Sequence, residues 1–197
     1  VPRIDYTGGG CPHILAEPER ENEITYSEDL NTSFPQQSGT DVDSTDNLAP
    51  DGTNTAYQIT STGAGKLQTN STSLSASTTY TLSFYAKNID ATEVKSRVYV
   101  SGSNTGGLTS VSYISQINTS TWTRIEHVFT TSSATTGYYL YLSNALNSGG
   151  TVQVWGAQLE VGSYATSYIP TSGGTVTRNK DIFTRDGIGS LINDSEG

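Results

Sequence analysis

The sequence predicts an all-β fold, an antiparallel β-sandwich of the jelly-roll type with extended N- and C-terminal arms. Charged residues make up only 15% of the 197 residues, whereas Ser and Thr together exceed a quarter and glycine occurs 20 times. This composition is typical of short strands joined by polar turns. Segments in which apolar and polar residues alternate also recur, with turn residues and no helical period between them. The length suits one sizeable core.

Two arms flank one predicted domain. Residues 1–22 form the N-terminal arm, where three consecutive glycines mark a flexible turn before a short strand around Ile14. Residues 23–170 form the β-sandwich domain. Residues 171–197 are polar and contain several glycines, so we expect a linker to a following domain.

Alternation assigns sides to the strands of the domain. Along residues 80–87 every second residue is apolar, which predicts one buried face and one wet face. His127 falls on the inward side of its strand with Phe129, so we expect a packed imidazole. Residues 31–52 are polar, acidic and rich in turn residues, and they predict a long surface loop. The predicted core strands are residues 55–61, 80–87, 96–102, 110–115, 122–130, 137–143 and 151–161.

The charge balance argues against nucleic acid as a partner. Phosphate binding needs clustered Lys and Arg, but the net charge is -9 and the 10 basic residues are spread over the chain. No stretch approaches the ~18 apolar residues of a membrane helix, so we expect no membrane insertion. Cys11 is the single cysteine, which excludes an internal disulfide framework.

Sequence motifs for catalysis are missing. The two histidines are His13, in the arm, and His127, and there is no GxSxG sequence for a serine nucleophile. The ExDxxE carboxylate pattern of laminarinase-like glycosidases does not occur, nor does the QxH motif of jelly-roll alginate lyases. We therefore expect no catalytic residues and no enzyme activity in this chain.

Outward-facing aromatic residues are the most informative candidates for binding. Tyrosine rings on a sheet can stack on the apolar faces of sugar rings, while nearby polar groups pair with hydroxyls. Cross-strand aromatic pairing, or burial under a neighbouring chain, is the alternative explanation. The two tryptophans, Trp122 and Trp155, lie in apolar strands and favour core positions. The candidate carbohydrate contacts are Tyr85, Tyr99, Tyr139, Tyr141, Lys87 and Arg97.

Several segments resemble a known family. They are PRIDYTGGGCP, EPERENEITYSEDL, APDGTNTA, YTLSFYAK and VWGAQLEVGSYATSYIPTSGGTVTRNKD. These segments are similar to phage tail-fibre, tailspike and related virion proteins that carry a carbohydrate-binding-module-like jelly roll. The resemblance covers nearly the whole chain, and the run WGAQLE followed by ATSYIPT is its most specific part.

The resemblance implies a module of an extracellular virion or tail appendage. It implies surface polysaccharide and other virion proteins as partners, and a possible homotrimer. Trp155, Ala157 and Leu159 would be the inward side of the last core strand. Many such jelly rolls hold a structural calcium ion, for which Asp29 and Glu160 are the candidate ligands, although Trp and Gly replace the usual acidic pair.

We therefore expect a non-catalytic adhesion module that binds polysaccharide. Two alternatives stay open at this point. The module could be a structural, trimerising or decorating element whose exposed aromatics form an interface, because exposed apolar patches often mark partner surfaces. It could also be a fragment of a polysaccharide depolymerase, which the resemblance to tailspikes favours and the missing motifs disfavour.

Overall fold

The computed structural model describes residues 3–5, 13–100, 107–133 and 137–182. These residues are almost entirely β-structure, and none of their helices is long and apolar enough to span a membrane. The elements are β1 (Arg3–Asp5), β2 (His13–Leu15), β3 (Arg20–Asn22), α1 (Leu30–Ser33), β4 (Gln36–Asp43), β5 (Tyr57–Gln68), β6 (Thr72–Ser73), β7 (Thr79–Asn88), β8 (Lys95–Val100), β9 (Gly107–Ser112), β10 (Thr123–Thr130), β11 (Gly137–Leu146), β12 (Thr151–Val161) and β13 (Val176–Arg178).

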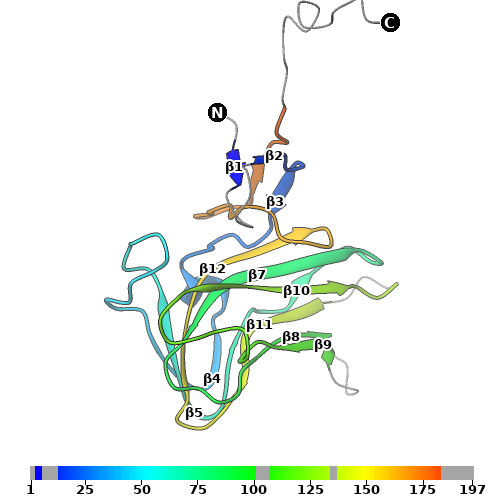
Figure 1. The fold of residues 1–197 in the computed structure, drawn as a ribbon. Coiled ribbons are helices and arrows are strands. Elements are labelled where there is room, and N and C mark those ends of the chain that lie inside the picture. The colour runs from blue at the N-terminus through cyan, green and yellow to red at the C-terminus, as the bar shows by residue number, and fades with distance from the viewer. Residues whose placement is uncertain (1–2, 6–12, 101–106, 134–136, 183–197) are drawn as a thin grey trace, which may run out of the picture. The chain divides into compact units, whose positions relative to one another are not determined.

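Strand β5 joins the two layers of the sandwich. Its residues 57–60 pair with β12, and its residues 65–68 pair with β11. The first layer therefore has the order β10-β7-β12-β5 and the second the order β5-β11-β8-β9, with β4 beside β5 and β6 beside β11 (Figure 1). A strand that passes from one sheet into the other makes the corner of such a sandwich. All these pairings are antiparallel, so the predicted jelly-roll β-sandwich is confirmed.

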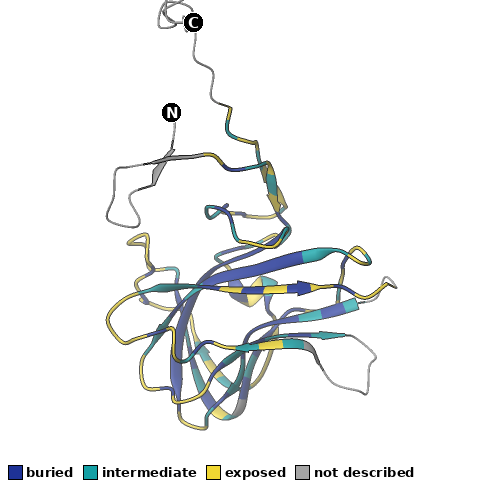
Figure 2. Cartoon of the chain, turned by 45° about the vertical axis from the view of Figure 1, so that its right-hand side comes forward, coloured by how far each residue is buried: buried dark blue, intermediate teal, exposed yellow. Residues whose placement is uncertain are grey.

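The core fills the space between the two layers. Buried residues follow the strands, and exposed residues gather in the connecting segments (Figure 2). In β7 the residues predicted to point inward are buried, but Thr81 and Ser83 on the predicted wet side are buried too, so the alternation of burial holds there only in part. In β8 Val98 is fully buried and Val100 is half-buried. The residues that contribute most from the strands are Ile59, Leu67, Tyr80, Leu82, Phe84, Val98, Ile125, Phe129, Tyr138, Leu140, Leu142, Val152, Val154 and Leu159.

Strand β12 is buried on both faces. Its residues 151–160 are all buried, and the register against β7 shifts between Trp155 and Gln158. Gly156 lies in this bulge with φ of 65°, a conformation that favours glycine. The extra residue places Trp155 opposite Tyr85 on the outer side, whereas Ala157 enters the main core. The prediction that Trp155 shares the inward side with Ala157 and Leu159 is therefore wrong.

Residues 22–27 pair with β12 through backbone hydrogen bonds, and residues 165–171 cover its outer face, where Tyr168 packs on Trp155. The Asn22 Nδ2 group donates to the carbonyl oxygens of Ala157 and Ile169, at 3.3 and 2.9 Å. In return, the Gln158 side-chain oxygen accepts from the Ile169 amide at 2.7 Å. Residues near the two ends of the domain are thus held on the first layer by buried hydrogen bonds, each worth about 1 kcal/mol.

The predicted surface loop at residues 31–52 is partly wrong. The structure has the single turn α1 there, followed by β4, which pairs along β5. Asp29 is the N-cap of α1, and its side chain accepts from the Thr32 amide at 3.2 Å. Strand β4 carries mostly exposed polar residues, so it lacks the apolar alternation that identifies a strand in sequence.

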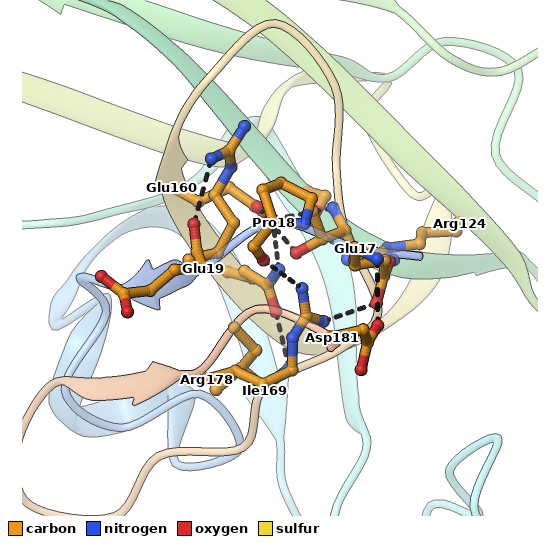
Figure 3. A network of polar contacts seen from close by, with 12 residues as sticks. Glu17, Pro18, Glu19, Arg124, Glu160, Ile169, Arg178 and Asp181 are labelled. Atoms are coloured by element: carbon orange, nitrogen blue, oxygen red, sulfur yellow. Dashed lines mark hydrogen bonds and ion pairs between the residues drawn. The ribbon is translucent and has the colours of Figure 1, made fainter. Parts of the chain in front are cut away.

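The described residues of 1–20 and 178–197 form a separate small unit, whereas residues 21–22 and 171–177 of the predicted arms belong to the unit of the sandwich. Strands β1 and β2 pair in it, which confirms the short strand around Ile14. The Glu17 carboxylate contacts the Arg178 guanidinium at 2.8 Å (Figure 3). The Glu17 amide donates to the Asp181 carboxylate at 2.9 Å, and the Asp181 amide donates to the Glu17 carbonyl at 2.9 Å. Residues near the two ends of the chain therefore lie side by side. His13 lies in β2, whereas Cys11 is outside the described residues.

A buried polar chain crosses between the layers at His127. The imidazole is fully buried, as predicted, and its Nδ1 lies 2.9 Å from the Ser96 hydroxyl, which donates to the Tyr141 carbonyl at 3.0 Å. Because the Ser96 proton points to Tyr141, His127 must carry its proton on Nδ1 and donate. Burial lowers the pKa of His127 from 6.5 to about 4.

We predict that this histidine makes folding stability fall in acid. Above pH 6.5 neither state binds the proton. Between pH 6.5 and about 4 the unfolded chain binds it and the folded chain does not, so the free energy of unfolding drops by about 3 kcal/mol. Urea unfolding at several pH values, compared with His127→Leu, should show that the variant lacks this part of the pH dependence. The control His13→Leu should retain it, and equal slopes in all three proteins would contradict the assignment.

We also predict that Gly156→Ala destabilises the bulge. A Cβ at this position would lie 3.3 Å from Cε2 of Tyr168, at a φ that costs an L-residue about 1–2 kcal/mol. Chemical unfolding followed by tryptophan emission should report that loss, because Trp155 is the neighbouring residue. Gly174→Ala is the matched control, since nothing lies within 4 Å of its Cβ. Equal stability of the two variants would show that the bulge tolerates a side chain.

Candidate carbohydrate-binding face

Four of the six predicted contacts lie together on the outer face of the second layer. Tyr139 of β11 is directly opposite Tyr99 of β8, and Tyr141 is directly opposite Arg97. Opposite residues in an antiparallel pair project to the same side with Cβ atoms about 5 Å apart. The alternate residues Val98, Tyr138, Leu140 and Leu142 point into the core and are fully buried. We call Arg97, Tyr99, Tyr139 and Tyr141 the tyrosine face.

Two side chains of the tyrosine face, Arg97 and Tyr99, are in direct contact. The Arg97 guanidinium lies over the ring of Tyr99, 5.1 Å from its centroid, in a cation–π arrangement. Burial raises the pKa of Tyr141 above its usual value, and the nearby Arg97 charge opposes that rise. Tyr141 is nearly covered, whereas Arg97, Tyr99 and Tyr139 are half-buried. The face therefore presents the rings of Tyr99 and Tyr139 and the Arg97 guanidinium to solvent in part, whereas the Tyr141 ring is almost inaccessible.

A hollow of about 320 Å³ lies beside Arg97 on the same layer. Sequence reasoning missed its residues, because polar residues at strand positions are common and only the register brings them together. The register between β8 and β11 shifts between Tyr141 and Asn144, and Ala145 adopts a φ of 54°. This irregularity in β11 lies at the hollow. Its lining residues are Lys95, Arg97, Thr109, Ser110, Asn144 and Ala145.

The other two predicted contacts lie on the first layer and do not join the tyrosine face. Tyr85 packs against Trp155 and Tyr168, with ring centroids 5.6 and 6.5 Å away. Lys87 lies over the ring of Trp122, 5.5 Å from its centroid. Both residues are on the outer side of β7, as predicted, but Tyr85 is packed beneath Tyr168 of the covering segment. The six residues therefore do not form one site.

The two candidate calcium ligands are surrounded by hydrogen-bond donors. Asp29 accepts from the amide and hydroxyl of Thr32 and from the Tyr57 hydroxyl, and the Thr32 hydrogen bonds lower the pKa of Asp29. Glu160 is fully buried on β12 and accepts from the Gln158 side-chain amide and from the amide and hydroxyl of Thr166. Calcium needs six to eight oxygen ligands, not donors. These two residues do not fit a shared calcium ion, and the prediction of calcium stays a prediction.

A second hollow, of about 460 Å³, contains Asp29. Tyr26, Glu28 and Tyr57 also line it, together with small polar residues. The Glu28 carboxylate accepts from the Tyr168 hydroxyl at 3.2 Å. This hollow is acidic, in contrast to the hollow beside Arg97.

The chemistry of the tyrosine face is that of binding. Its groups are phenol rings and a guanidinium, with the hydroxyl and amide of Ser110 and Asn144 beside them. Aromatic rings and polar groups of this kind suit a sugar chain. Within the described ranges, no three His, Cys, Asp or Glu residues come together in a group that could hold a metal ion.

The fold is a β-sandwich, and the tyrosine face is its candidate binding surface. The chain belongs to the carbohydrate binding domain family, whose pattern matches residues 26–149. No curated protein matches the sequence.

The chain is similar to several solved structures. A Clostridium thermocellum xylanase 10B structure with the modules CBM22-1 and GH10, complexed with xylohexaose, has a TM-score of 0.50 and 12% identity, over 74% of this chain and 28% of that chain. The CBM22-1 xylan-binding domain of Paenibacillus barcinonensis Xyn10C has a TM-score of 0.48 and 13% identity, over 74% and 94%. The enzymatically active domain of bacteriophage CBA120 tailspike protein 4 has a TM-score of 0.43 and 12% identity, over 64% and 19%. At these identities the likeness concerns the fold alone.

We predict that Tyr85 and Tyr139 differ in what their removal costs. Tyr85→Ala should lower the free energy of unfolding by about 2–3 kcal/mol, because the ring packs among Trp155 and Tyr168. Tyr139→Ala should cost about 1 kcal/mol, since its ring is half-buried on an outer face. Chemical unfolding of both variants measures the difference. A larger loss for Tyr139→Ala would mean that this ring is structural.

Proposed function

We propose that this chain is a non-catalytic module that binds polysaccharide through the tyrosine face. The observation that carries the proposal is the convergence of Arg97, Tyr99, Tyr139 and Tyr141 on one outer sheet face. Membership of the carbohydrate binding domain family supports the class of ligand. The rings stack on sugar faces, and the hollow beside Arg97 supplies donors and acceptors for sugar hydroxyls.

The proposed setting is an adhesion protein of a phage tail or virion. The segments WGAQLE and ATSYIPT support it through their resemblance to tail-fibre and tailspike proteins. In this setting the module is extracellular, contacts the polysaccharide of a host surface and is joined to other virion modules.

The test is a glycan array followed by calorimetric titration of the glycan that binds best. The double variant Tyr99→Ala, Tyr139→Ala should bind at least about tenfold more weakly, because each lost ring contact is worth about 1 kcal/mol. Tyr164→Ala is the matched control, since this tyrosine is exposed at 49% and follows the last strand of the first layer. Its affinity should equal that of the wild type. Running the array with calcium and then with chelator tests the calcium prediction separately.

Two results would contradict the proposal. Undiminished binding by the double variant would place the sugar site elsewhere. A stable oligomer by light scattering, with no glycan bound, would support the alternative that the tyrosine face is an interface between subunits.

A further inference from the structure

We infer that the tyrosine face selects acidic polysaccharides, with uronate or sulfated sugars, over neutral ones. This inference rests on the proposed function and names the class of ligand for the same site. It is carried by the distribution of charge over the second layer and by the surroundings of Arg97.

The second layer is basic in a strongly acidic chain. The whole sequence has 19 Asp and Glu against 10 Lys and Arg. Strands β5, β6, β8, β9 and β11 contain no Asp or Glu, but they contain Lys66, Lys95 and Arg97. Neutral sugars give no reason to exclude carboxylates from these strands, since carboxylates are good acceptors for hydroxyls. An anionic ligand gives such a reason, because like charges at short range repel.

Arg97 is available to a ligand, unlike Arg124 and Arg178. Arg178 pairs with Glu17, and Arg124 donates to the Thr166 carbonyl and the Ser83 hydroxyl. In the part of the chain that the structure describes, no carboxylate pairs with Arg97, which rests instead over the Tyr99 ring. Stacking fixes the plane of the guanidinium and leaves its fork of donors free to bind a carboxylate or sulfate with two hydrogen bonds.

The groups around Arg97 complete a site for an anion. Ser110 lies opposite Arg97 on β9, and Asn144 lies opposite Lys95 on β11, so both can donate into the hollow. Lys95 is held by Glu93 at 2.8 Å, which leaves Arg97 as the main charge. Lys66 follows the same face along β5, two residues from Gln68, which pairs with Tyr141. A sugar ring on Tyr99 or Tyr139 would thus have its acidic group beside Arg97.

The net charge of the chain makes this selectivity measurable. A protein of charge -9 repels a polyanion except where local cations outweigh the distant carboxylates. Screening at physiological salt removes charge effects beyond about 8 Å, so only groups near the ligand decide the outcome. Binding of a polyanion by this chain would therefore depend on Arg97 and would weaken as salt rises.

The experiment compares polygalacturonate with fully methyl-esterified polygalacturonate, which keeps the backbone and masks the charge. Dextran sulfate and dextran form a second pair. Affinity electrophoresis and calorimetry are run in chelator, so that calcium cannot bridge the carboxylates. The variants are Arg97→Gln, and Lys87→Gln as the control that removes one charge from the first layer. We expect a charged polymer to bind more tightly than its uncharged partner, and Arg97→Gln alone to weaken that binding about tenfold.

The outcomes separate this inference from the proposed function. The inference would be overturned if charged and uncharged polymers bound equally well, or if only a neutral glycan bound. The proposed function would still stand if that binding were lost in the Tyr99→Ala, Tyr139→Ala variant. Polyanion binding that Arg97→Gln does not weaken would also overturn it. If neither these polymers nor any glycan on the array binds, the proposed function fails and the inference fails with it.

Discussion

The structure depends on the burial of both faces of β12. One face packs into the core, and the other carries Trp155 and Gln158, whose polar atoms need partners away from water. The Thr55 hydroxyl, just before β5, accepts from the indole, and the Ile169 amide of the covering segment donates to the Gln158 amide oxygen. The outer face of β12 is therefore closed by the chain itself. On the outer face of the second layer, by contrast, Tyr99 and Tyr139 remain half-exposed, which is why we place the proposed site there.

On that second layer, cross-strand register does the positioning. Each ring of the tyrosine face is fixed by a strand whose alternate residues are locked in the core. The stacking of Arg97 on Tyr99 further restricts two side chains that would otherwise lose rotamer freedom on binding. Buried hydrogen bonds from His127 to Ser96 and from Ser96 to the Tyr141 carbonyl connect strands β8 and β11 of this layer to β10 of the first layer. A face held in this way would need little rearrangement to bind the proposed ligand.

The sequence allowed the β class and most core strands to be predicted, because alternation is a local signal. It placed Tyr99 and Tyr139 outward correctly, since nothing interrupts the alternation before them. The prediction for Trp155 was wrong because Gly156 inserts a bulge, although a glycine inside a strand is itself a signal for one. Alternation also could not show that Tyr168 covers Tyr85, because that contact joins residues far apart in the chain. For the same reason it could not show the hollow beside Arg97.

The charge distribution and the position of the aromatic rings both favour the tyrosine face as the place where an anionic ligand would bind. The acidic hollow at Glu28 and Asp29 and the basic face at Arg97 give the module an uneven potential, although its net charge is strongly negative. An anionic chain would be repelled by most of the surface and attracted at the tyrosine face. Complementary potentials of this kind contribute more to specificity than to affinity. The aromatic rings would then supply contact area, and Arg97 would decide which polysaccharides are accepted.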